Sequence, residues 1–483
     1  MGIPKDWLNS LLYIGGQFVE AETGRRYSVH NPANGEALGS APDASASDVR
    51  RAIDVAYEAF PGWSRATALE RSQALRRLYE NMVAHREELA RLITSEEGKP
   101  LAEARGEAQI GAEYVAWYAE EARRVYGETV PGAWPEQRIL VIRQPVGVVG
   151  AITPWNFPVS MVTRKMAPAL AAGCTVVLKP AEHTPLSALA LARLAEAAGI
   201  PAGVFNVVTA QDPAPAGRQL LDDPRVRKLS FTGSTVVGKY LMRESAAQVK
   251  KLSLELGGHA PTLVFADADL EQAVAGVIAS KFRNSGQTCI CLNRVLVEES
   301  IAEPFSEKLA QAVAQLKVGD GMESGVEVGP LINDEGLAKV AAQVEDAVAR
   351  GAVVACGGQR LARPGGNFFA PTVLLNVRPD MAVMREETFG PVAPVTTFRD
   401  EQEAIALAND TVYGLASYIF SRDVSRVLRV SERLEYGIVG VNDPVPTVVE
   451  APFGGVKESG FGREGGHWGM DNFLEVKYIS LRI

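Results

Sequence analysis

The chain has 483 residues, of which 47% are hydrophobic and 22% are charged, and its formal net charge is −9 at pH 7. This length exceeds that of one ordinary core and predicts two or more lobes. The negative charge argues against nucleic acid and against anionic membrane surfaces as partners. Four cysteines in so long a chain do not make a disulfide framework, which favours a reducing compartment.

Targeting and metal-binding signals are not apparent. The segment from Met1 to Trp7 lacks an apolar signal core, and no apolar run approaches the length of a membrane span. We therefore expect a cytoplasmic protein. The five histidines are scattered, with no His-Glu-x-x-His or Cys-x-x-Cys spacing, so we predict no metal site.

The coarse pattern of the chain is α/β. Residues 45–125 show apolar positions at helical spacing. After residue 145, short apolar strands alternate with helices, which indicates a parallel sheet covered on both faces. The predicted strands are 146–152, 175–179, 205–208 and 229–232, and the predicted helices are 160–172 and 187–198. A second series begins near Glu255, with strands at 262–265, 295–298 and 418–420.

Cys289 stands in a glycine-containing turn after an amphipathic helix for which Asp267 is the expected N-cap. Its polar neighbours Gln287, Thr288 and Asn293 suit a thiolate better than an apolar core. This pattern favours a nucleophile over a buried structural cysteine.

Two segments fit neither lobe. Residues 139–142 form a short apolar strand between two arginines, and residues 474–483 alternate before they shift register. Exposed strands of this kind invite pairing with another chain.

Several motifs accompany the Cys289 turn. They are Val149–Pro158, Phe231–Gly238, Leu254–Pro261, Glu386–Pro391 and Pro452–Gly460. Together these motifs resemble the aldehyde dehydrogenase superfamily over nearly the whole chain, and most closely its succinate semialdehyde dehydrogenases.

The resemblance implies two open parallel-sheet, Rossmann-type lobes plus a small oligomerisation sheet. The implied NAD-binding domain covers residues 1–122 and 146–254, and the implied catalytic domain covers 255–470. Segments 123–145 and 471–483 would join the subunits of a homodimer or homotetramer.

The resemblance also assigns three catalytic roles. Cys289 would attack the aldehyde to give a thiohemiacetal and then a thioester. The side chain of Asn156 would stabilise the oxyanion, although without the other motifs a turn asparagine would be the better reading. Glu255 would activate the water that releases the acid, and burial at a strand end should raise its pKa.

The resemblance implies a cofactor site. Glu387 would hold the nicotinamide ribose, and the turn at Gly233 would face the pyrophosphate. Glu182 would accept hydrogen bonds from the adenosine hydroxyls and repel a 2′-phosphate, so we expect NAD, with NADP less favoured. A Glu182 that only capped the following helix would leave this preference open. The full predicted set is Thr153, Trp155, Lys179, Glu182, Gly233, Ser234, Leu256, Glu387 and Phe389.

The substrate prediction rests on two arginines. Arg164 and Arg283 match residues that succinate semialdehyde dehydrogenases use to hold a distal carboxylate, and Thr447 stands where a serine is common. Succinate semialdehyde is therefore the expected substrate, with glutarate semialdehyde, α-ketoglutarate semialdehyde or another small aldehyde as alternatives. The loop Pro444–Pro446 resembles relatives that act on α-ketoglutarate semialdehyde. Either arginine could instead belong to a structural salt bridge.

Three alternatives remain at this point. A relative that passes the thioester to coenzyme A is disfavoured by Glu255, which such enzymes generally lack. An inactive cofactor-binding paralogue is disfavoured because all the catalytic residue types are retained. Cys291 leaves open a reversible oxidised link to Cys289, although so short a bridge is strained.

Overall fold

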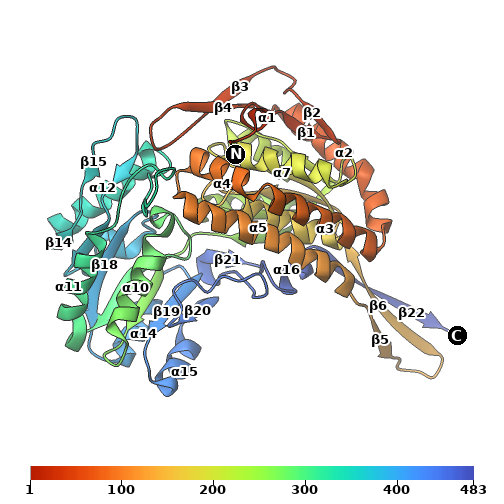
Figure 1. Ribbon diagram of the computed structural model, residues 1–483. Helices are drawn as coiled ribbons and strands as arrows, with labels where there is room; N and C mark the ends of the chain where they lie inside the picture. The colour runs from red at the N-terminus through yellow and green to blue at the C-terminus, as the bar shows by residue number, and fades with distance from the viewer. Residues whose placement is uncertain (1) are drawn as a thin grey trace.

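The computed structural model of the protein describes residues 2–483. Two large sheets form two lobes that lie side by side (Figure 1). We call the eight-stranded sheet the first sheet and the seven-stranded sheet the second sheet. This architecture confirms the predicted α/β fold with two open, largely parallel sheets.

In the first sheet, the five strands from β9 to β11 run parallel, whereas β1, β2 and β21 pair antiparallel at the edges. All four strands predicted between residues 146 and 232 are present within a few residues. The strand order is β2 (Gln17–Val19), β1 (Leu12–Ile14), β9 (Phe205–Val207), β8 (Thr175–Lys179), β7 (Val148–Ile152), β10 (Val226–Thr232), β11 (Lys251–Glu255) and β21 (Gly460–Phe461).

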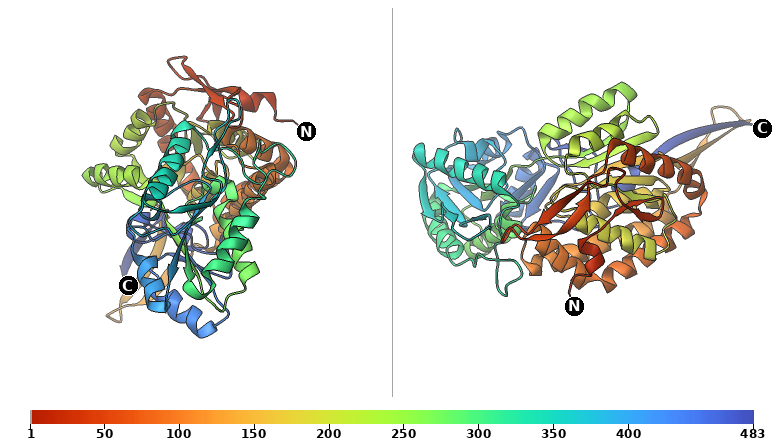
Figure 2. Two further views of the ribbon diagram at one scale, coloured as in Figure 1. Left: turned by 90° about the vertical axis from the view of Figure 1, so that its left-hand side faces the viewer. Right: turned by 90° about the horizontal axis from the view of Figure 1, so that it is seen from above.

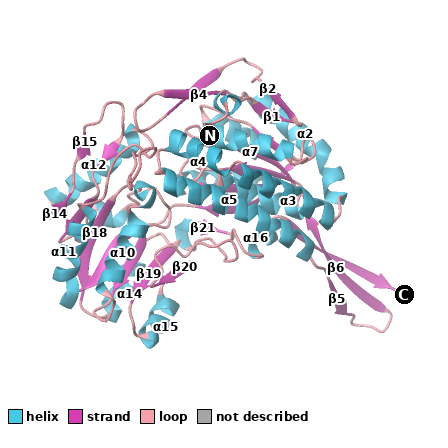
Figure 3. Ribbon diagram, viewed as in Figure 1, coloured by secondary structure: helices cyan, strands magenta, loops and turns pink. Residues whose placement is uncertain are grey.

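Helices cover both faces of the first sheet (Figure 3). Both faces of β8 are apolar, because Val177 points into one core and Val176 and Leu178 point into the other. A strand of this kind needs helices on both sides. One face carries α2 (Ala46–Arg65), α8 (Pro213–Asp222) and α9 (Thr235–Ser245). The other carries α6 (Ser160–Ala172) and α7 (Pro185–Ala197), on which α1 (Lys5–Leu8), α3 (Ala68–Ala84), α4 (Arg86–Glu97) and α5 (Leu101–Glu121) pack.

The second sheet is also covered on both faces. Its strand order is β14 (Val353–Cys356), β17 (Thr372–Leu375), β18 (Val392–Phe398), β13 (Leu292–Glu298), β12 (Ala260–Val264), β19 (Ala416–Phe420) and β20 (Ile438–Val441). One face carries α10 (Leu270–Lys281) and α11 (Ala302–Val313). The other carries α12 (Asp334–Ala349), α13 (Ala382–Arg385), α14 (Glu401–Asn409) and α15 (Val424–Arg433).

A three-stranded antiparallel sheet projects from the first lobe, as Figure 2 shows from above. It contains β22 (Leu474–Arg482), β6 (Gln137–Pro145) and β5 (Glu128–Pro131), so both segments predicted to lie outside the lobes meet in it. The short helix α16 (Trp468–Asp471) precedes β22. Two small hairpins complete the fold, β3 (Arg26–His30) with β4 (Ala37–Pro42) and β15 (Arg360–Leu361) with β16 (Phe368–Phe369).

One helix boundary differs from the prediction. Asp269, and not Asp267, caps α10, because its side chain accepts a hydrogen bond from the backbone N–H of Gln272. Asp267 instead accepts hydrogen bonds from the Ser421 hydroxyl and from the backbone N–H of Arg422. Tertiary contacts thus decide which of two suitable acids forms the cap. Of residues 2–483, no helix is long and apolar enough to span a bilayer.

Candidate active site

Cys289 lies on the loop between α10 and β13. The loop starts with Asn284 and Ser285 in the left-handed region, at φ values of 50° and 57°. This conformation costs about 1–2 kcal/mol for each non-glycine residue. Hydrogen bonds hold it, since the N–H of Asn284 donates to Oε2 of Glu103 at 2.7 Å and the Ser285 hydroxyl donates to the Gly329 carbonyl at 2.9 Å. The strained turn therefore presents Cys289 in a fixed position.

Two cavities meet at Cys289, which lines both. One has a volume of 300 Å³ and contains Arg164 and Arg283, and we call it the arginine cavity. The other has a volume of 500 Å³ and contains Gly233 and Ser234 at the start of α9, and we call it the α9 cavity. A nucleophile at the junction of two cavities can meet two ligands at once.

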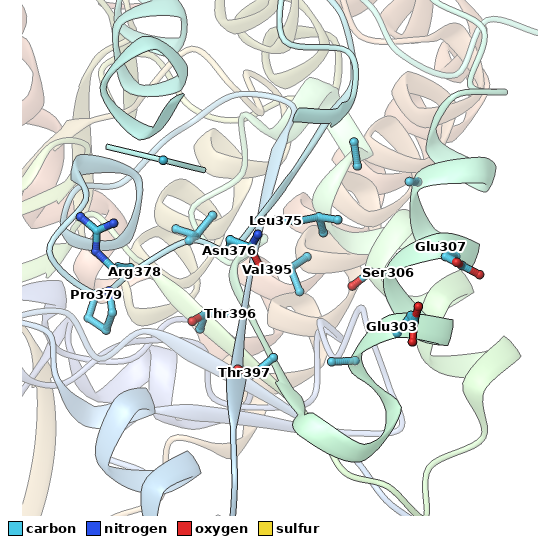
Figure 4. Close-up of a pocket in the computed structure, with 15 residues that line it drawn as sticks. Glu303, Ser306, Glu307, Leu375, Asn376, Arg378, Pro379, Val395, Thr396 and Thr397 are labelled. Carbon is cyan, nitrogen blue, oxygen red and sulfur yellow. The ribbon is translucent and has the colours of Figure 1, made fainter. Parts of the chain in front are cut away.

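A larger hollow of 880 Å³ lies elsewhere, between α11 and the strands β17 and β18 (Figure 4). Ser306 and Glu307 stand on one wall, and Asn376 and Arg378 stand on another. No cysteine or histidine is among the described residues that line it. Although this hollow is larger than the two cavities at Cys289, it lacks a cysteine or histidine among its described lining residues, so we do not take it as the reactive site.

The surroundings of the Cys289 thiol disfavour its ionised form. Burial raises its pKa to about 12, and the carboxylates of Glu387 and Glu255 act in the same direction. The Arg164 cation opposes them. Cys291 is a second free thiol, fully buried, and it donates to the Gly286 carbonyl at 3.3 Å.

Asn156 follows β7 and reaches the Cys289 loop. Its Nδ2 donates to the Gln287 carbonyl at 2.9 Å. Lys99 Nζ donates to the Asn156 carbonyl at 2.7 Å, which fixes the backbone of this turn. The amide of Asn156 has a second N–H, so one donor remains available, and Asn156 lines the α9 cavity with Cys289.

Glu255 ends β11 and is 2% exposed. Neither carboxylate oxygen has a hydrogen-bond partner among residues 2–483. Burial raises the pKa of Glu255 well above the usual value, and Glu464 adds to this, whereas Arg164 opposes it. A β-carbon at Gly454 would lie 2.9 Å from Oε1 of Glu255, and Glu255 lines neither cavity at Cys289. Its carboxylate must therefore turn to reach a group bound at Cys289.

Glu464 binds two cations beside Glu255. The Arg164 Nε atom lies 3.1 Å from Glu464 Oε2, and Lys165 Nζ contacts the other carboxylate oxygen. Lys165 also donates to Thr232 Oγ1 at 2.5 Å. Although burial opposes ionisation, Lys165 and Arg164 hold the pKa of Glu464 below its usual value. Glu464 was not predicted as a site residue from the sequence. The feature that could have indicated it is its position between Gly462 and Gly465, where the backbone can approach other groups closely.

The three predicted substrate residues share the arginine cavity with Cys289. They are Arg164, Arg283 and Thr447. The Arg164 Nη2, the Arg283 Nε and the Thr447 hydroxyl have no hydrogen-bond partner among the described residues. Arg164 therefore has two sides, one paired with Glu464 and one with an unused donor.

The α9 cavity brings most predicted cofactor residues together. Glu387 Oε1 accepts a hydrogen bond from the Gly258 N–H at 2.9 Å, and burial raises the pKa of Glu387. Only glycine fits at position 258, because a β-carbon there would lie 2.3 Å from the Cys289 carbonyl oxygen. The predicted residues that line this cavity are Trp155, Gly233, Ser234, Leu256, Glu387 and Phe389.

The other predicted cofactor residues lie outside that cavity. Lys179 Nζ lies 3.1 Å from Glu182 Oε2, and Glu182 lines a separate cavity of 260 Å³. Lys179 and His183 hold the pKa of Glu182 at about 2, although burial opposes them. Thr153 is buried, and its hydroxyl has no partner in the described part of the chain.

Comparison with known proteins agrees with this geometry. Residues 18–479 match the aldehyde dehydrogenase family. The chain is 54% identical to succinate-semialdehyde dehydrogenase [NADP(+)] of Escherichia coli over 97% of both chains, and 54% identical to glutarate-semialdehyde dehydrogenase of Pseudomonas putida over 98% of this chain and 97% of that one. The crystal structure of succinate-semialdehyde dehydrogenase from Burkholderia pseudomallei is similar at a TM-score of 0.98 and 52% identity, covering 99% of each chain.

Proposed function

The chain belongs to the aldehyde dehydrogenase family, and from this premise we propose that it oxidises a short acid semialdehyde, with succinate semialdehyde first, to the dicarboxylate with NAD(P). The arginine cavity carries the proposal, because it places two guanidinium groups with unused donors beside a nucleophile. A buried cation calls for an anion, and a guanidinium suits a carboxylate in shape and charge.

The names of the relatives support the same substrate class. The relative from E. coli is named for succinate semialdehyde and the one from P. putida for glutarate semialdehyde, two substrates that differ by one methylene. A single methylene in an apolar pocket changes binding by only about 1–3 kcal/mol. Glutarate and α-ketoglutarate semialdehydes therefore remain the alternatives within the proposal.

The chemistry would begin at Cys289. Its thiol first loses the proton to water, the thiolate attacks the aldehyde carbon, and the oxygen of the resulting thiohemiacetal accepts hydrogen bonds from Asn156 and from the Cys289 N–H. When bound, the nicotinamide cofactor supplies the hydride acceptor that turns the thiohemiacetal into a thioester. Glu255 then takes a proton from water, the resulting hydroxide attacks the thioester carbon, and the acid and the Cys289 thiolate are released.

The residues of the α9 cavity fit such a cofactor. The first turn of α9 has backbone N–H groups without intrahelical partners, and these suit a pyrophosphate. Glu387 offers a buried carboxylate to ribose hydroxyls at the same cavity. Phe389 and Trp155 pack edge to face, with centroids 5.5 Å apart, and would flank the nicotinamide end.

We further propose that NAD is preferred to NADP. Glu182 is ionised at neutral pH because its pKa is held at about 2. A carboxylate in this position repels a 2′-phosphate and accepts hydrogen bonds from free ribose hydroxyls. The relative from E. coli is named for NADP(+), so this preference would set the present chain apart from it.

The proposal retains the predicted division of the chain. Residues 1–122 and 146–254 would bind the cofactor, and 255–470 would carry the catalytic loop. The projecting sheet, from segments 123–145 and 471–483, would join subunits of a homo-oligomer. Its solvent-exposed apolar side chains support this, including Val476 and Tyr478.

A substrate panel tests the proposed function. Succinate, glutarate and α-ketoglutarate semialdehydes would be compared with butanal and benzaldehyde, each with NAD and with NADP. We expect the highest kcat/KM for an acid semialdehyde. A higher kcat/KM for the uncharged aldehydes would refute the proposal, and cofactor binding without any turnover would favour an inactive paralogue.

A further inference from the structure

Tyr114 on α5 lines the arginine cavity but has no assigned role. It is 1% exposed, and its hydroxyl has no hydrogen-bond partner among residues 2–483. The Arg164 guanidinium carbon lies 5.4 Å from the centre of the Tyr114 ring and 3.9 Å from that of Phe453. Tyr114 is thus part of the wall against which the Arg164 cation is held.

A buried hydroxyl without a partner is unfavourable and calls for an explanation. Among the described residues of this cavity, Tyr114 combines near-complete burial with a rigid position on a long helix. Burial raises the pKa of Tyr114 although Arg164 opposes it, so the hydroxyl keeps its proton at neutral pH and can donate. A ligand acceptor in the cavity would satisfy it.

Arg164 alone does not supply all the hydrogen-bond donors that a bound carboxylate can accept. Its Nε lies 3.1 Å from Glu464 Oε2 and its Nη1 donates to Met161 Sδ at 3.7 Å, so Nη2 is the nitrogen that neither contact engages. A carboxylate bound at Nη2 needs further donors for its other oxygen lone pairs. Tyr114 stands next to this guanidinium, whereas Thr447 comes from a loop that is only half-buried.

We propose that the Tyr114 hydroxyl is a further substrate-binding group, which donates a hydrogen bond to the distal carboxylate of the semialdehyde. The inference rests on the proposed function, because it names a fourth contact for the same acid group, beside Arg164, Arg283 and Thr447. Tyr114 thereby favours acid semialdehydes over uncharged aldehydes of equal length, which gain nothing from a donor at this position.

The chain contains a matched control one helical turn away. Tyr118 is on the same helix, is fully buried, and has a hydroxyl that also lacks a partner among the described residues. It does not line the arginine cavity. The substitutions Tyr114→Phe and Tyr118→Phe each remove one oxygen and leave the aromatic ring, so packing on either side is retained.

The test measures kinetics of both variants with succinate semialdehyde and butanal. We expect Tyr114→Phe to raise the KM for the semialdehyde by about tenfold, the effect of a lost hydrogen bond to a charged group, with butanal kcat/KM within about twofold. Succinate, added as an inhibitor of butanal oxidation, should lose affinity by a similar factor. Tyr118→Phe should change neither the KM for the semialdehyde nor the affinity for succinate.

Two results would overturn the inference. Unchanged KM and succinate inhibition in Tyr114→Phe would show that the hydroxyl does not touch the acid group. An equal loss of kcat/KM with butanal and with the semialdehyde would assign Tyr114 a structural role. In that case the thermal unfolding midpoint of Tyr114→Phe is compared with that of Tyr118→Phe, which lacks a buried hydroxyl on the same helix. A wild-type enzyme without preference for acid semialdehydes would instead refute the proposed function itself.

Discussion

The Glu464 carboxylate lies 3.1 Å from the Nε atom of Arg164. Both members of this pair also act on the nearby Glu255 carboxyl: Glu464 raises its pKa and Arg164 lowers it. A charge that contacts the proposed substrate-binding arginine thus also raises the proton affinity of the expected base.

Replacement of Glu464 by Gln should shift the acid side of the pH–rate profile to lower pH. The base works when it is deprotonated, and loss of the like charge lowers the pKa of Glu255, so activity should persist at lower pH than in the wild type. The measurement is kcat against pH with a saturating semialdehyde. Breaking a buried ion pair also costs about 3–5 kcal/mol, so the unfolding midpoint should fall.

Glu432→Gln is the control, because Glu432 is exposed and should affect neither quantity. A shift of the acid limb to higher pH in Glu464→Gln would contradict the coupling between the two carboxylates.

Glu255→Gln should separate the two halves of the reaction. A Gln cannot take a proton from water, so the thioester should form and then persist. Rapid mixing should show a burst of NADH near one equivalent per site, followed by slow turnover. Cys289→Ala should show no burst, while cofactor binding is retained. Equal loss of burst and steady state in Glu255→Gln would contradict a role confined to deacylation.

The sequence predicted the parts of the site that follow from local pattern. The helix 160–172 was predicted with the bounds of α6, because it lies between a proline-containing turn and Gly173, which ends it in the left-handed region. The family resemblance predicted Cys289 as the nucleophile and Arg164, Arg283 and Thr447 as substrate contacts, and all four line one cavity.

Features that depend on distant contacts could not be predicted in this way. Lys165 and Glu464 are separated by 299 positions, and neither has a local pattern that indicates a buried pair. The orientation of Glu255 toward Gly454 depends on a loop nearly 200 residues later. Asp267 and Asp269 are equally suitable caps, and the contacts of Asp267 with Ser421 and Arg422 decide between them.

Arg283→Met should weaken binding of acid semialdehydes with little loss of stability. The Arg283 Nε has no hydrogen-bond partner among the described residues, so its removal breaks no hydrogen bond of that atom, although it takes away a cation that lowers the burial-raised pKa of the Glu103 carboxyl. We expect the KM for succinate semialdehyde to rise at least about tenfold, since a hydrogen bond to a charged group contributes about 1.5–3 kcal/mol. Butanal kinetics should stay within about twofold. Arg164→Met provides the contrast, because it should also lower the unfolding midpoint by breaking the pair with Glu464.

Charges on β22 should dissociate the protein. Val476 and Tyr478 are 69% and 58% exposed, and burial of such side chains in an interface stabilises association. Light scattering at micromolar concentration should give at least twice the chain mass of 51.7 kDa for the wild type, and a smaller mass for the double variant Val476→Lys/Tyr478→Lys. Val353→Lys, at a 50% exposed position on β14, is the control. A monomeric wild type would contradict the assignment of the projecting sheet.

Replacement of Glu182 should reverse the expected cofactor preference. Its carboxylate stays ionised across the usual assay range because its pKa is held at about 2, so the wild type should favour NAD at every pH between about 5 and 9. Discrimination should weaken below pH 6, where a phosphate monoester with a second pKa of about 6 loses charge. Glu182→Ser removes the repulsion and frees Lys179, now 3.1 Å from Glu182, to attract the 2′-phosphate. We expect kcat/KM with NADP to rise at least about tenfold, since loss of one close like-charge contact is worth about 1–3 kcal/mol. Glu182→Gln keeps a hydrogen-bonding side chain and isolates the effect of the charge. A wild-type kcat/KM with NADP equal to or above that with NAD would refute the preference.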